Sequence, residues 1–119
     1  MASAKYNIII EQGATFTRTI TWYSDLAMTT PVVLTSYTAA MKVKTKDLAT
    51  TVLSSAAGTI TLTLGGAAGT IVITISATNT AALTPTADGE YAYDLELTLS
   101  GVVTRLLEGR VTVSPEVTV

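Results

Sequence analysis

The chain has 119 residues, the usual size of one domain, and only 13% of them are charged, with a net charge of −2 at pH 7. It contains neither Cys nor His, which excludes disulfides, thiolate metal sites and imidazole catalysis. The seven Lys and Arg are spread thinly along the sequence, and no apolar stretch approaches the roughly 20 residues of a transmembrane helix, so we expect neither nucleic acid nor a membrane as partner.

Alternation of apolar and polar residues predicts two strands, at residues 6–10 and 15–22, separated by Gly13. In the second strand one face is large and mostly apolar, while the other is a row of threonines, as expected where one face of a sheet packs on the core. Arg18 interrupts the apolar face, and we expect it near a sheet edge, with its guanidinium reaching water or a carboxylate. Trp22 could form a recognition surface, but its spacing favours the centre of the core.

Residues 24–34 lack a sustained period and predict a loop, with a short edge strand at Val32 and Val33. A strand follows at residues 37–44, and Lys42, Lys44 and Lys46 share its polar outer face. Two interpretations of these lysines stay open. They form either a contact for an acidic partner or an ordinary solvated strand face.

A β-hairpin is predicted from two alternating segments, residues 59–64 and 70–75, which are joined by a glycine-rich loop. The loop does not resemble a phosphate-binding loop, because no Lys-Ser or Lys-Thr pair follows it and the next element alternates like a strand. One helical turn is then predicted over residues 79–83, capped by Ser76 or Thr78.

The longest clear alternation predicts a strand over residues 91–99, preceded by a turn at residues 86–89. The segment from Gly89 to Tyr91 resembles the tyrosine corner of immunoglobulin domains, in which Gly-x-Tyr begins a late strand after a helical turn. This resemblance implies that Tyr91 is the corner and that Tyr93 occupies the place of the second cysteine.

The last predicted strand covers residues 102–113, with a β-bulge near residues 106–107, and a short tail spans residues 114–119. About seven to eight strands and one short helical turn before Tyr91 predict an all-β protein, an Ig-like antiparallel β-sandwich that forms a single domain over residues 1–119.

The carboxylates are the remaining candidates for chemistry, since Cys and His are absent. Asp94 and Glu96 lie two residues apart on one strand face, which suits paired acids or hard-metal ligands but also any polar face paired with Lys or Arg on a neighbouring strand. Glu108 and Arg110, with Arg105 before them, flank the expected bulge and could be re-aimed by it or pair with each other. We expect no enzymatic activity, no cofactor and no metal site.

Three segments, residues 6–16, 34–41 and 88–97, together resemble small tailed-phage and prophage virion proteins. These proteins carry an Ig-like fold similar to the N-terminal domain of phage baseplate upper proteins, with a Leu-Thr-Gly-Tyr-Thr pattern before a basic strand and a late Gly-x-Tyr strand. Ser36 stands in place of the glycine of the first pattern.

The resemblance implies a structural protein of the virion, an adaptor or attachment protein in the tail, neck, collar or baseplate. Its expected partners are other virion proteins, namely tail, portal, fibre or capsid subunits, in a symmetric assembly of several copies. A capsid decoration protein is the alternative, and a carbohydrate-binding module is a third interpretation. The expected contact residues are Lys42, Lys44, Val117 and Val119, the last two adding a strand to a neighbour.

Overall fold

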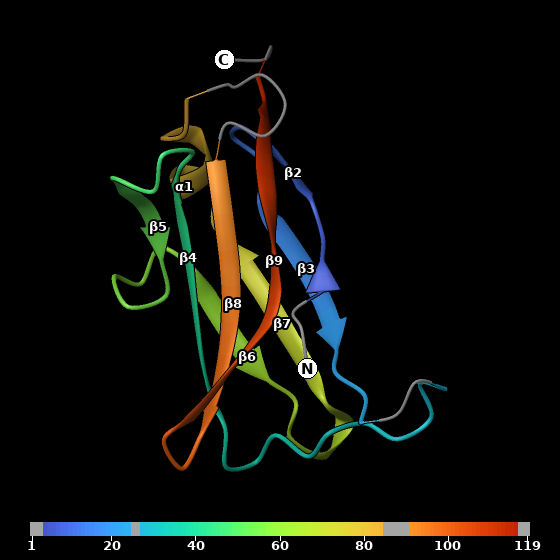
Figure 1. Ribbon diagram of the computed structural model, residues 1–119. Helices are drawn as coiled ribbons and strands as arrows, with labels where there is room; N and C mark the ends of the chain where they lie inside the picture. Colours follow the sequence, from blue (N-terminus) through green and yellow to red (C-terminus); the bar gives the residue numbers. More distant parts are fainter. Residues whose placement is uncertain (1–3, 25–26, 85–90, 117–119) are drawn as a thin grey trace.

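The computed structural model describes residues 4–24, 27–84 and 91–116. Within these ranges the chain forms nine β-strands, one short α-helix and one 3-10 turn. The strands build two sheets packed face to face (Figure 1). The predicted all-β sandwich is therefore confirmed.

The large sheet consists of four strands in a row, with two further short strands paired to β9 at one edge. Its order is β9 (Val102–Ser114), β8 (Tyr91–Leu99), β4 (Thr38–Thr45) and β5 (Thr51–Ser54), and both β1 (Ala4–Lys5) and β2 (Ile8–Glu11) pair with β9. The small sheet has the order β3 (Phe16–Thr21), β7 (Thr70–Ile75) and β6 (Thr61–Leu64). These two orders correspond to strands G-F-C-C′ and B-E-D of immunoglobulin-type sandwiches.

One feature of the pairing departs from the expected antiparallel sandwich, because β1 and β2 run parallel to β9. Alternation identifies a strand but carries no information about its neighbour or direction, so the sequence could not reveal this pairing. Gly109 permits the close approach, since a Cβ atom at this position would lie 2.3 Å from the Tyr6 carbonyl oxygen.

The core lies between the two sheets, where the inward side chains of alternate positions meet. Burial alternates along β7 and β8 as the sequence predicts, and the fully buried side chains include Ile71, Ile73, Ile75, Leu95, Leu97 and Val111. Trp22 is only partly buried and packs edge to face on Tyr37, with ring centroids 5.5 Å apart. The predicted central place for Trp22 is therefore wrong, because the residue follows the last paired position of β3 and lies at the margin of the core.

Arg18 does lie on an edge strand, as expected, but its guanidinium contacts aromatic residues. Its Nη1 donates a hydrogen bond to the Tyr6 hydroxyl, and its guanidinium carbon lies 5.6 Å from the ring centroids of both Tyr6 and Phe16. Arg18 thus ties the segment between β1 and β2 to the small sheet through one cation–π contact and one hydrogen bond, both with Tyr6.

A short helix, α1 (Ala77–Ala81), closes the end of the sandwich at which β9 finishes (Figure 1). It begins two residues earlier than predicted, and Ser76 is its N-cap, since the Ser76 hydroxyl accepts a hydrogen bond of 3.2 Å from the Asn79 amide. At the start of β8 the Tyr91 hydroxyl accepts a bond of 3.4 Å from the Thr84 amide, as a tyrosine corner requires. Gly89 lies outside the described residues.

The loops agree in part with expectation. The predicted hairpin is β6 and β7, and a 3-10 turn (Gly66–Ala68) joins them. Val32 and Val33 form no strand. An isolated bridge pairs Tyr23 with Pro31 instead, and the Val32 amide donates a hydrogen bond of 2.8 Å to the Trp22 carbonyl oxygen.

Candidate functional site

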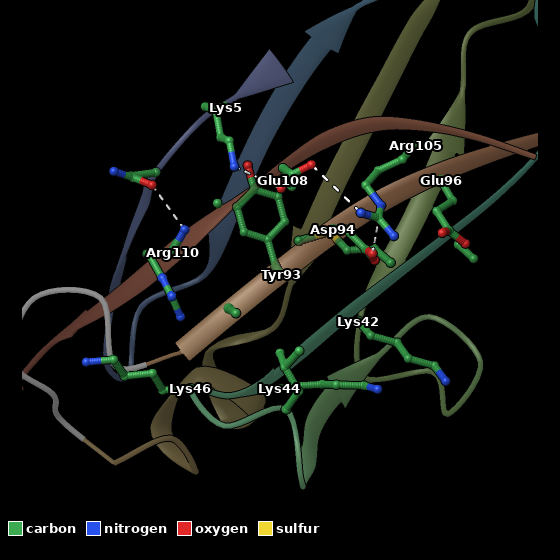
Figure 2. Close-up of a pocket in the computed structure, with 16 residues that line it drawn as sticks. Lys5, Lys42, Lys44, Lys46, Tyr93, Asp94, Glu96, Arg105, Glu108 and Arg110 are labelled. Carbon is green, nitrogen blue, oxygen red and sulfur yellow. Dashed lines mark hydrogen bonds and ion pairs between the residues drawn. The ribbon is translucent and has the colours of Figure 1, made fainter. Parts of the chain in front are cut away.

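The outer face of the large sheet is hollowed into a groove of about 570 Å³, shown in Figure 2. Charged side chains from β1, β4, β8 and β9, and Lys46 directly after β4, line this groove. Its basic members are six of the seven Lys and Arg of the chain: Lys5, Lys42, Lys44, Lys46, Arg105 and Arg110. Its acidic members are Asp94, Glu96 and Glu108, so six positive and three negative charges leave the groove at +3 in a chain of net charge −2.

The register of the strands explains why these charges meet. Alternate residues of one strand point to the same face, and neighbouring strands place their outward residues in rows. One row crosses four strands, in the order Lys42, Asp94, Glu108 and Lys5. The next row consists of Lys44, Ala92 and Arg110.

The groove owes its depth to differences in side-chain length. Ala92 and Ala40 occupy outward positions on β8 and β4, where the sheet carries only a methyl group. Long Lys and Arg side chains stand beside them. Figure 2 shows Lys42, Lys44 and Lys46 along one side of the groove, across from Glu108 and Arg105.

One half of the groove is held by ion pairs. The Arg105 guanidinium lies 3.4 Å from Asp94 Oδ2 and 3.8 Å from Glu108 Oε2, and Lys5 Nζ lies 3.0 Å from Glu108 Oε1. The predicted bulge places Arg105 there, because the register of β8 and β9 shifts between Leu95 and Glu96. The prediction that the acidic face of β8 pairs with a basic residue of a neighbouring strand is therefore confirmed for Asp94.

The other half of the groove has a surplus of positive charge. Four cations form no ion pair with any carboxylate of the described residues, and these are Lys42, Lys44, Lys46 and Arg110. The sequence suggested that Arg110 and Glu108 pair with each other. In the structure the Glu108 carboxylate contacts Lys5 and Arg105 instead. The backbone amide of Arg110 donates a hydrogen bond of 3.0 Å to Asn7 Oδ1.

Tyr93 is a buried ionisable side chain that lies beneath the groove. Burial raises the pKa of Tyr93 to about 12, and the nearby charge of Arg18 offsets part of this rise. Its hydroxyl donates a hydrogen bond of 2.5 Å to the Tyr6 carbonyl oxygen. Tyr93 is therefore protonated at neutral pH and serves to fasten the N-terminal segment to β8.

The arrangement suits the binding of an anionic group more than the binding of a cation. In the part of the chain that the structure describes, no group of three or more Asp and Glu side chains is placed to hold a metal ion. The two expected contact residues on β4, Lys42 and Lys44, both lie in the groove, whereas Val117 and Val119 are outside the described residues.

No helix among the described residues is both long and apolar enough to cross a membrane. Comparisons with protein-family models and with curated proteins find no match to this chain.

Proposed function

We propose that this protein is a non-enzymatic structural component of a tailed-phage virion, an adaptor or attachment protein of the tail, neck, collar or baseplate. The observation that carries the binding role is the concentration of six of seven basic residues in one groove, four of them without a carboxylate partner among the described residues. The phage setting rests on the resemblance of residues 6–16, 34–41 and 88–97 to small virion proteins.

The opposite face of the sandwich supports an adaptor role because its chemistry differs from that of the groove. The outward positions of β3, β7 and β6 form rows without any charged residue: Thr17, Thr74 and Thr61; Thr19, Val72 and Thr63; Thr21 and Thr70. A surface of methyl and hydroxyl groups can be covered by another protein at little desolvation cost compared with charges. The molecule thus offers two faces of different character, as a protein that joins two different neighbours requires.

Mass spectrometry of purified particles, with copy number, tests this proposal. A tail, neck or baseplate station predicts about 6 or 12 copies per particle, in keeping with cyclic symmetry. Hundreds of copies would assign the protein to the capsid lattice as a decoration protein. Absence from the particles would overturn the virion role.

A further inference from the structure

We propose that the groove binds an acidic segment of a partner protein and that one partner carboxylate lies above Ala92, between Lys44 and Arg110. This inference rests on the proposed function, since it gives the chemistry of one of the adaptor's contacts.

The distribution of charge favours an acidic occupant. Outside the groove the chain has one basic residue and six acidic ones, so the groove is a positive region on a negative protein. Lys42 and Lys44 project from the same face of β4, about 7 Å apart along the strand. Like charges held this close repel each other, and a bound carboxylate would relieve that repulsion.

The shape of the site fits a single carboxylate. Lys44, Ala92 and Arg110 form one row across β4, β8 and β9, so the two cations stand two strands apart, a backbone separation of about 10 Å. The methyl group of Ala92 leaves the space between them open. Both side chains are long and flexible, and the Arg110 guanidinium can grip a carboxylate with two parallel hydrogen bonds.

The acidic residues beside the site favour a peptide over a nucleic acid. Asp94, Glu96 and Glu108 line the same groove. A nucleic acid strand carries one negative charge per nucleotide, so its phosphates would pass close to these carboxylates and be repelled by them. An extended peptide can place a carboxylate near Lys44 and an uncharged residue near Asp94. Charge complementarity therefore favours a peptide in which uncharged residues separate the acidic ones.

The probe for the experiment is a fluorescently labelled peptide of alternating Ser and Glu, with binding followed by anisotropy at low salt. Ala92→Glu places a carboxylate of the protein itself between Lys44 and Arg110, and Ala92→Gln adds nearly the same volume without charge. Thr63→Glu adds the same charge on the outer face of the small sheet. We expect Ala92→Glu to weaken binding about tenfold or more and Thr63→Glu to change it by less than about threefold, while Ala92→Gln, which fills the open space without adding charge, causes an intermediate loss.

Several results would overturn the proposal. One is a wild-type protein that does not bind the peptide, and another is an equal loss of binding in Ala92→Glu and Thr63→Glu, which would show a general effect of net charge. Tighter binding of a single-stranded oligonucleotide of equal charge would assign the groove to nucleic acid. Salt-sensitive self-association that Ala92→Glu abolishes would identify a second copy of the chain as the occupant. The copy number in particles is measured separately, so the groove assignment can fail while the virion role stands.

Discussion

Replacing Thr80 by valine removes the hydroxyl that joins α1 to the turn between β2 and β3. The Thr80 side chain is fully buried. Its Oγ1 donates its one hydrogen to the Ala14 carbonyl oxygen at 2.8 Å, shared with the Ala77 carbonyl oxygen at 3.1 Å, and accepts a bond of 3.1 Å from the Gly13 amide. Valine has the same shape, so the substitution preserves the packing and removes the polar contacts.

The expected cost follows from the groups left without a partner. A buried amide or carbonyl that loses its hydrogen bond costs about 1–3 kcal/mol. Ala14 is exposed, so its carbonyl oxygen can bond water in place of the Thr80 hydroxyl. We therefore expect a loss of about 2 kcal/mol in the free energy of unfolding. For a domain of this size that loss lowers Tm by about 8 °C. Urea and thermal unfolding followed by circular dichroism measure both quantities.

Two matched variants separate the hydrogen bonds from other effects. Thr78→Val makes the same change at an exposed position of the same helix, and it should alter stability by less than about 0.5 kcal/mol. Thr80→Ser keeps the hydroxyl and removes a methyl group, at a cost of about 1 kcal/mol. Equal stabilities of Thr80→Val and Thr78→Val, or a greater loss in Thr80→Ser than in Thr80→Val, would refute this reasoning.

Three further predictions concern Tyr93, Gly69 and Arg105. The pKa of Tyr93 is about 12 in the folded protein and about 10 in the unfolded chain. The unfolded state therefore loses this proton first, and the free energy of unfolding falls as the pH rises from about 10 to about 12. Tyr93→Phe should lose less stability than wild type over this pH range in urea titrations. Gly69→Ala should destabilise more than Gly58→Ala in the same assay, because both glycines have positive φ but only at Gly69 would a Cβ atom lie 2.9 Å from other atoms. Arg105→Ala should cost less than about 1 kcal/mol, with a difference that shrinks in high salt, because its ion pairs are exposed; a large loss that persists in salt would contradict this.

The features that the sequence predicts well are those that depend on neighbouring residues in the chain. The strands of the β6–β7 hairpin, the long strand β8 and the Ser76 cap each follow from local alternation or from one capping residue. The bulge in β9 was also visible, since two consecutive apolar residues break the alternation there. Local pattern is sufficient in these cases because the Ser76 cap bonds an amide three residues later, and because alternation along a strand shows which of its side chains face the core.

The features that the sequence misses depend on which strands become neighbours. The unpaired cationic half of the groove combines Lys42 and Lys44 with Arg110, more than sixty residues later in the chain, and only the register through β8 brings them together. The sequence does not show that the small residue Ala92 lies between Lys44 and Arg110, because this depends on the register of three strands. For the same reason, the contact of Arg18 with Tyr6 could not be read from a strand whose partners were unknown.

The parallel pairing of β2 with β9 determines how the molecule responds to mechanical tension. A pull on the flanks of the described chain, at Ala4 and Glu116, draws β2 and β9 in opposite directions along their common axis. The hydrogen bonds between them, including those that continue through Tyr6 and Gln12, are then loaded together in shear. An antiparallel pair pulled from one end would open one bond at a time. A domain anchored through both flanks would therefore resist extension at its first and last strands, before the core bears any load.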